Sequence, residues 1–135
     1  MKMFLKIVLA VTVLVSACGE KEIESDPPVI SSLSLVQDSI MSQQGAVLEI
    51  VYSISDDNGL SKFRLTILDD FPDARFALAP WSDDLDFDVT GTEYSDTVVV
   101  SLPFPDVEPG QYKLSFTVAD IDDNEKAQEK SFVIY

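Results

Sequence analysis

The chain has 135 residues, with 24 acidic and 9 basic side chains and no histidine, so its formal net charge is −15. Phosphate backbones and anionic headgroups repel so acidic a surface, which argues against nucleic-acid partners and against electrostatic membrane binding. The lack of histidine also removes the commonest general base and the commonest metal ligand.

The first segment has the pattern of a cleaved secretory signal. Lys2 and Lys6 provide a positive start, residues 7–15 are apolar except for Thr12, and small residues precede Cys18. A membrane-spanning helix needs about 20 apolar residues, and this run is shorter. We therefore predict that residues 1–17 are a signal peptide that is removed.

The four residues Val15-Ser16-Ala17-Cys18 resemble the lipobox of bacterial lipoproteins. The resemblance implies that Cys18 is acylated and becomes the new N-terminus. Cys18 is the only cysteine in the sequence, so it has no partner for a disulfide within the chain. Each buried methylene contributes about 0.8 kcal/mol, so two or three acyl chains would hold the protein on a bilayer.

The residues after Cys18 resemble signals that determine where a lipoprotein is located in the cell. Gly19 in this place is similar to the signal that sends lipoproteins to the outer membrane, and Lys21-Glu22 resembles the export signal of surface lipoproteins in Bacteroidetes-type bacteria. These resemblances imply a lipid-anchored outer-membrane protein, either surface-exposed or facing the periplasm. Residues 18–28 contain one isolated aliphatic residue and two prolines, which predicts a solvated, flexible tether.

Residues 29–135 are long enough for one domain with its own core. Apolar and polar residues alternate with a period of two, as in half-buried strands. Asp84, Asp86 and Asp88 alternate with apolar residues, which predicts an edge strand whose outward carboxylates prevent pairing with another chain. The other predicted strands lie at 33–35, 46–55, 61–68, 98–102, 111–120 and 132–134.

About seven short strands separated by turn signals predict an all-β fold, a single immunoglobulin-like antiparallel β-sandwich. Pro27-Pro28-Val29-Ile30, Asp56-Asp57-Asn58-Gly59-Leu60 and the segment 109–124 look like the Ig-like and cadherin-like modules of bacterial surface proteins. Tyr112, just after Pro109-Gly110, matches the place of the tyrosine corner in such folds. The resemblance implies a fold and carries almost no functional specificity.

In that fold the tether and the turns at 56–59, near 91 and at 120–124 gather at one end of the sandwich. Calcium takes six to eight oxygen ligands from such loops, and Asp120-Ile121-Asp122 resembles the Asp-x-Asp element of cadherin calcium sites. The alternative is that these aspartates make local hydrogen bonds within their turns. The candidate ligands of a structural Ca²⁺, the one cofactor considered, are Asp26, Asp56, Asp57, Asp120, Asp122 and Asp123.

The opposite end should carry the long connection 69–82 and the turn 103–109. These segments hold four aromatic residues, Phe71, Phe76, Trp81 and Phe104. Their rings could form a contact patch for a sugar or a protein, because rigid rings give much area at little entropic cost. The alternative is that they fold inward and plug the open end of the sandwich.

Catalysis without histidine or a spare thiol would have to rest on carboxylate pairs such as Asp83-Asp84, and a small sandwich offers little room for a cleft between them. We therefore expect no enzyme. The sequence favours a membrane-anchored lipoprotein that acts as a non-catalytic binding or interaction module, attached through covalent lipid, with a protein or glycan partner. The alternative is a structural accessory subunit of a larger outer-membrane complex, with calcium as its candidate stabilising ion.

Overall fold

The computed structural model describes residues 26–72 and 78–135. The predicted signal peptide 1–17, Cys18, most of the predicted tether and Phe76 lie outside the described residues. The described residues contain no helix that is long and apolar enough to cross a membrane. Their regular elements are β1 (Val29–Leu35), β2 (Ser39–Ile40), β3 (Val47–Ser55), β4 (Leu60–Asp69), β5 (Asp83–Asp88), β6 (Glu93–Ser101), β7 (Gly110–Asp120) and β8 (Glu125–Ile134).

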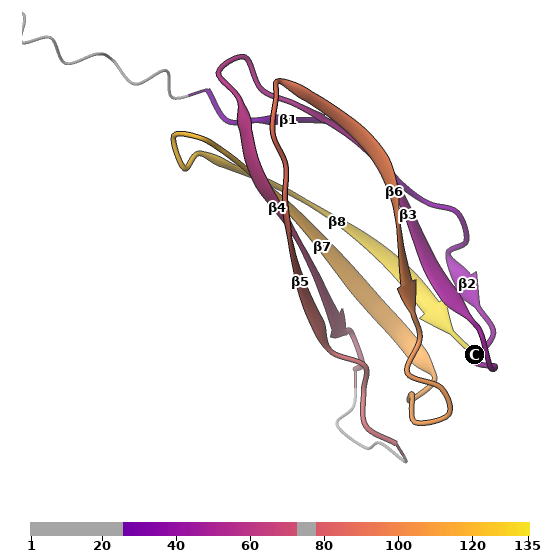
Figure 1. Ribbon diagram of the computed structural model, residues 1–135. Coiled ribbons are helices and arrows are strands. Elements are labelled where there is room, and N and C mark those ends of the chain that lie inside the picture. Colours follow the sequence, from indigo (N-terminus) through magenta and orange to yellow (C-terminus); the bar gives the residue numbers. More distant parts are fainter. Residues whose placement is uncertain (1–25, 73–77) are drawn as a thin grey trace, which may run out of the picture.

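The strands form two sheets that pack face to face (Figure 1). One sheet has the order β1-β3-β6 and the other has the order β2-β8-β7-β4-β5. The all-β sandwich prediction is therefore confirmed, and β5 is an edge strand as expected. The exception to the predicted antiparallel pairing is β2, a two-residue strand that runs parallel to β8 and that the sequence pattern did not reveal.

The core lies between the two sheets and is built from the alternating apolar positions. Leu48, Ile50 and Ile54 of β3 are at most 1% exposed. The rings of Tyr52 and Phe63 meet across the sheets at a centroid distance of 4.8 Å. Burying a side chain of this size stabilises the fold by roughly 1.5–3 kcal/mol, so this alternation specifies both the strands and their register.

The two ends of the sandwich are named here by their relation to the point where the described chain begins. The proximal end comprises residues 26–28 and the turns 56–59, 89–92 and 121–124. Backbone hydrogen bonds connect these turns, from Asp56 N–H to Thr92 O at 2.9 Å and from Ile121 N–H to Gly59 O at 3.0 Å. The predicted gathering of the turns is thus confirmed.

The distal end comprises the segments 36–46, 70–72, 78–82 and 102–109 together with Tyr135. These segments lie at the other tip of the sandwich from residues 26–28 (Figure 1). Glu108 ties two of them together, because its backbone N–H donates to Ala79 O at 3.3 Å and its carboxylate accepts the Leu78 N–H at 2.6 Å.

Candidate functional site

Two buried aspartates organise the proximal end. Asp120 is 0% exposed, and its Oδ1 accepts the backbone N–H groups of Asp122 at 2.9 Å and Asn124 at 2.8 Å. Its Oδ2 accepts the Asn124 side-chain amide at 3.0 Å. Asp56 is built in the same way, since its Oδ2 accepts N–H groups from Asn58 and Gly59 at 2.9 and 3.0 Å. Both carboxylates therefore stabilise the turn that follows them.

Burial and hydrogen bonding act in opposite directions on the pKa of Asp120. Burial by itself raises this pKa, because it disfavours the charged carboxylate. The hydrogen bonds from Asn124 and Asp122 favour the charged form and outweigh burial, so the pKa lies below its ordinary value. Asp120 is consequently an ionised carboxylate whose two oxygens both accept hydrogen bonds from its own turn.

The six aspartates expected to gather as calcium ligands do not form one cluster. Asp26, Asp57, Asp122 and Asp123 are exposed, whereas Asp56 and Asp120 are buried and bonded within their turns. In the part of the chain that the structure describes, no three acidic side chains come together in a way that could hold a metal ion. The geometry favours the turn role for Asp56 and Asp120.

Tyr112 organises the distal end. Its ring is 0% exposed, and its hydroxyl donates to the backbone carbonyl of Glu108 at 2.5 Å. The same oxygen accepts the backbone N–H of Trp81 at 3.1 Å. This bond from the start of β7 back to the preceding turn confirms the predicted tyrosine corner. Burial, the largest influence, raises the pKa of Tyr112, and the Trp81 amide opposes that rise.

Trp81 and Phe71 pack onto this tyrosine. Trp81 is 5% exposed, and its ring centroid lies 6.4 Å from Tyr112 and 6.2 Å from Phe132. Phe71 is half-buried and meets Tyr112 edge-on at 5.2 Å. A Cβ on Gly110 would lie 1.9 Å from the Phe71 ring, so glycine is needed there for the ring to lie against the backbone. This packing favours the plug interpretation for Trp81, whose indole is not available to a partner.

The remaining distal aromatic residues divide differently. Phe104 is 45% exposed and Leu78 is 41% exposed, so both present apolar surface to solvent. Phe76 lies outside the described residues. Of the four rings proposed as a contact patch, the structure therefore places Phe104 on the surface, Trp81 in the core and Phe71 between the two.

A groove of about 520 Å³ opens at the distal end beside these loops. It forms where the chain leaves β1, which pairs with β3, and crosses to pair with β8 as β2. Val36, Met41 and Tyr135 are each more than half exposed at this place. We call it the distal groove; its apolar lining is Val36, Ile40, Met41, Ala46, Val47 and Tyr135, and its polar lining includes Gln37, Ser39, Gln43 and Glu49.

The sequence did not indicate the distal groove. The segment 36–46 shows only the turn signal Gln43-Gln44-Gly45, because the crossing between sheets has no alternating pattern. The crossing is held by backbone bonds, among them Ser42 N–H to Tyr135 O at 2.7 Å and Tyr135 N–H to Ile40 O at 3.0 Å. Backbone pairing of this kind leaves little trace in side-chain composition.

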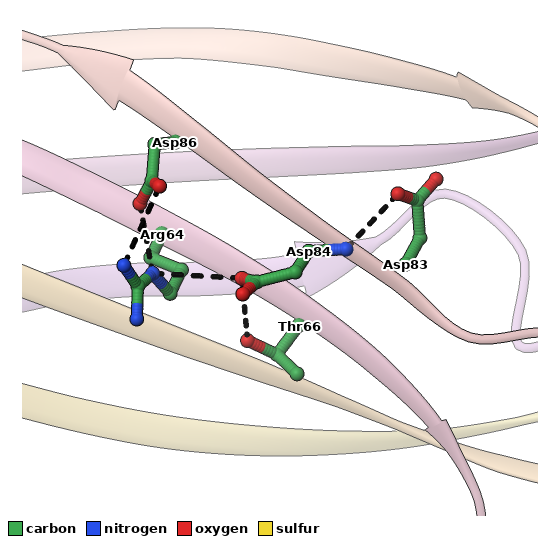
Figure 2. Close-up of polar contacts among 5 residues, drawn as sticks. All are labelled: Arg64, Thr66, Asp83, Asp84 and Asp86. Carbon is green, nitrogen blue, oxygen red and sulfur yellow. Dashed lines mark hydrogen bonds and ion pairs between the residues drawn. The ribbon is translucent and has the colours of Figure 1, made fainter.

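The outer face of β4 and β5 carries a ladder of opposite charges (Figure 2). Arg64 Nε donates to Asp86 at 2.8 Å and lies 3.5 Å from Asp84, which also accepts the Thr66 hydroxyl at 3.3 Å. Hydrogen bonding to Arg64 lowers the pKa of Asp86. These carboxylates are partnered on an open sheet surface, and Asp83 Oδ1 accepts the Asp84 N–H at 2.9 Å.

Comparison with known proteins gives one family and little else. The family model described as "Domain of unknown function (DUF4625)" matches residues 16–135. A solved structure of a β-glucosidase from Listeria innocua in complex with glucose is similar at 14% identity and a TM-score of 0.43. The match covers 79% of this chain but 15% of that one, and likeness at this level carries no argument about activity. No curated protein matches the sequence.

Proposed function

The chain belongs to the DUF4625 family, a domain of unknown function, and we propose that it acts as a non-catalytic binding module of the cell envelope. In this proposal a lipid on Cys18 attaches the protein to the outer membrane and residues 18–28 form the tether. The distal end then presents the binding surface to a protein or glycan partner.

The position of the distal groove relative to the chain entry carries this proposal. The described chain begins with Asp26 at the proximal end. β2 and the C-terminus, whose residues Ile40 and Tyr135 line the distal groove, lie at the opposite tip (Figure 1). In this proposal a flexible tether joined to one tip leaves the other tip free to reach away from the membrane. The groove, at about 520 Å³, is in the size range of ligand sites, and loops on a rigid scaffold are the usual place for binding residues.

The placement of the carboxylates supports a non-catalytic role. A glycosidase needs two carboxyl groups that face each other across the scissile bond. Asp84 instead bonds with Thr66 and Arg64 on an open sheet surface (Figure 2), and Asp120 is buried within its own turn. Both Asp84 and Asp120 therefore bond with groups of the fold and, within the described residues, do not face another carboxylate across a cleft.

Replacement of Cys18 tests the anchor. Cys18→Ser should move the protein from the membrane fraction to the soluble envelope fraction, and mass spectrometry of the wild-type protein should find acyl mass on residue 18. A wild-type chain with an intact leader, or without acyl mass, would contradict the lipid anchor.

Photo-crosslinking in living cells tests the binding surface. A photoreactive residue in place of Met41, in the distal groove, should give a discrete adduct with an envelope protein or glycan. The same residue in place of Val99, which is 58% exposed on the outer face of β6, is the matched control. Adducts of equal yield from both positions, or none from Met41, would contradict the assignment of the groove.

A second candidate, the accessory subunit of a larger complex, is favoured by the outer face of the three-stranded sheet. On β3 and β6 this face carries only two charged residues, Glu49 and Glu93, although the whole chain has 24 acidic residues. Val51 and Val99 are 38% and 58% exposed on it. Adducts from Val99 alone would favour this candidate over the distal groove. The outward residues of β3 and β6 are Val47, Glu49, Val51, Ser53, Ser55, Glu93, Ser95, Thr97, Val99 and Ser101.

A further inference from the structure

A second groove opens at the side of the sandwich, between β5 of one sheet and β6 of the other. Its volume is about 310 Å³, close to the lower limit for small-ligand sites. Tyr52 and Phe63, both 2% exposed, form its base. Phe87 and Tyr94 line it nearer the surface, and Tyr94 is 37% exposed. We call it the side groove; it is separate from the distal groove.

The rings of the side groove are held by stacking on the core. Phe87 stacks on Phe63 at a centroid distance of 4.7 Å and an interplanar angle of 14°. Tyr94 stacks on Tyr52 at 6.1 Å and 27°. The partly exposed rings therefore rest on buried rings that cannot move freely. A ligand that stacks there would find the aromatic surface already ordered, which lowers the entropic cost of binding.

Asp96 adds a carboxylate to this aromatic surface. It pairs with Tyr52 in the register of β3 and β6, so it points toward the inner side of the sandwich. Its Oδ1 accepts the Thr97 N–H at 2.8 Å and its Oδ2 accepts the Tyr94 hydroxyl at 3.3 Å. Burial raises the pKa of Tyr52, and Tyr94 and Asp96 raise it further, which agrees with a carboxylate that faces the groove.

Asp96 has no cation beside it among the ion pairs of the described residues, which involve Arg64 and Lys113. Asp88, the other acid that lines the groove, is opposite Lys62 in the register of β4 and β5. The side groove thus combines ordered aromatic rings with a positioned carboxylate that lacks a positive partner.

We propose that the side groove binds the cationic side chain of an arginine or lysine presented by a protein partner. A cation within about 6 Å of an aromatic ring is attracted by the negative face of the ring, and a carboxylate adds a charge-assisted hydrogen bond. The apolar stem of such a side chain matches the apolar walls. The chain's net charge of −15 also attracts basic partners over longer distances. This proposal does not depend on the distal groove.

The test is a titration of the protein as isolated from the cell envelope with N-acetyl-arginine methylamide, followed by NMR of ¹³C-labelled tyrosine rings. The signals of Tyr52 and Tyr94 should shift, and those of Tyr112 and Tyr135 at the distal end should stay unchanged. The citrulline analogue has the same shape without the charge. It should bind roughly tenfold more weakly, the loss expected when a cation–π contact and an ion pair disappear together.

Two variants with the same charge change complete the test. Asp96→Asn should weaken arginine binding to about the same extent as the citrulline substitution, and Asp106→Asn, an exposed aspartate at the distal end, should leave it unchanged. Equal binding of citrulline and arginine would overturn the proposal in favour of a neutral ligand such as a sugar. Equal losses in both variants, or no shift at Tyr94, would overturn it as well. The citrulline comparison uses the wild-type chain, so it still tests the proposal if Asp96→Asn fails to fold.

Discussion

The two ends of this sandwich solve one structural problem with different chemistry. Each end has to close the gap between two sheets and satisfy the backbone groups of its turns. The proximal end does so with charge, since Asp120 and Asp56 accept the N–H groups of the turns they begin. The distal end does so with ring area, since Trp81 and Phe71 pack on Tyr112.

The difference indicates which end can carry variable contacts. The two buried carboxylates of the proximal end, Asp120 and Asp56, accept N–H groups of their own turns, and the described acidic side chains there form no group of three that could hold a metal ion. The distal end fixes its loops by a hydroxyl and buried rings, and it leaves Phe104, Leu78 and Met41 between 41% and 51% exposed. Because buried groups hold the distal loops in place, the exposed side chains of these loops remain available to a partner.

Loss of the distal ring area should have the largest effect. Trp81→Ala removes a 5%-exposed side chain from between Tyr112 and Phe132 and should lower the free energy of unfolding by about 3–5 kcal/mol. Phe104→Ala at the same end is the control and should change it little, because Phe104 is exposed. Denaturant unfolding measures both. An equally large loss for Phe104→Ala would mean that the distal loops pack more tightly than the structure shows.

Loss of the proximal charge comes next. Asp120→Ala leaves the N–H groups of Asp122 and Asn124 without their acceptor and should lower the free energy of unfolding by about 1.5–3 kcal/mol, the usual range for hydrogen bonds to a charged group. Asp122→Ala changes an exposed aspartate in the same turn and should have little effect. The comparison of the two ends fails if both alanine variants unfold at the same denaturant concentration.

The sequence predicted best the strands whose side chains alternate between buried and exposed positions. The strands expected at 46–55 and 111–120 are found at Val47–Ser55 and Gly110–Asp120, because their alternating side chains alternate between core and solvent. Two other strands begin well before their apolar residues. Residues 98–102 marked only the end of β6, and Phe132 and Ile134 marked only the end of β8.

The parts that the sequence missed are held by backbone pairing or lie beside an opening. The inner positions Tyr94 and Asp96 of β6 border the side groove, so they lack the apolar character that marks a buried strand. The first half of β8 is polar but pairs with β7 from Glu125 onward. Both grooves arise from such places, and neither could be found by hydrophobic periodicity.

Removal of a single hydroxyl sharpens the comparison on the distal side. Tyr112→Phe keeps the ring and its packing but leaves Glu108 O and the Trp81 N–H without their partner. We expect a loss of about 1–2 kcal/mol in the free energy of unfolding, clearly less than for Trp81→Ala. A loss as large as that of Trp81→Ala would show that the hydrogen bonds, rather than ring area, close the distal end.

The two ends should also weaken at opposite limits of pH. The pKa of Asp120 is lowered from its ordinary 3.8, so its contribution is complete above that value and is lost as the pH falls through the lower, folded-state pKa. The pKa of Tyr112 is raised from 10.0, so its contribution is complete below that value and is lost as the pH rises through the higher, folded-state pKa.

Unfolding at a series of pH values measures this asymmetry. The stability difference between wild type and Asp120→Ala should narrow below about pH 4, and the difference between wild type and Tyr112→Phe should narrow above about pH 10. Tyr52, whose pKa is also raised by burial, titrates in every variant and cancels in both differences. Differences that stay constant over the whole range would remove the electrostatic distinction between the ends.

The smallest effect is expected between the ends, on the charged ladder of β4 and β5. Arg64 bonds with Asp86 and lies near Asp84, but the side chains of Arg64 and Asp86 are 49% and 58% exposed. Water and salt screen such pairs, and ordering two long side chains offsets much of their attraction. Arg64→Ala should therefore leave the free energy of unfolding almost unchanged at physiological salt.

The association of the protein should not change either, because the carboxylates of Asp84, Asp86 and Asp88 would remain on the edge strand β5. We expect Arg64→Ala to have the same oligomeric state as the wild type in light scattering, whereas replacing Asp84, Asp86 and Asp88 together with serine should promote pairing of β5 edges. If Arg64→Ala destabilised the fold as much as Asp120→Ala, the ladder would be structural, and the ends would not be the places where charge matters most.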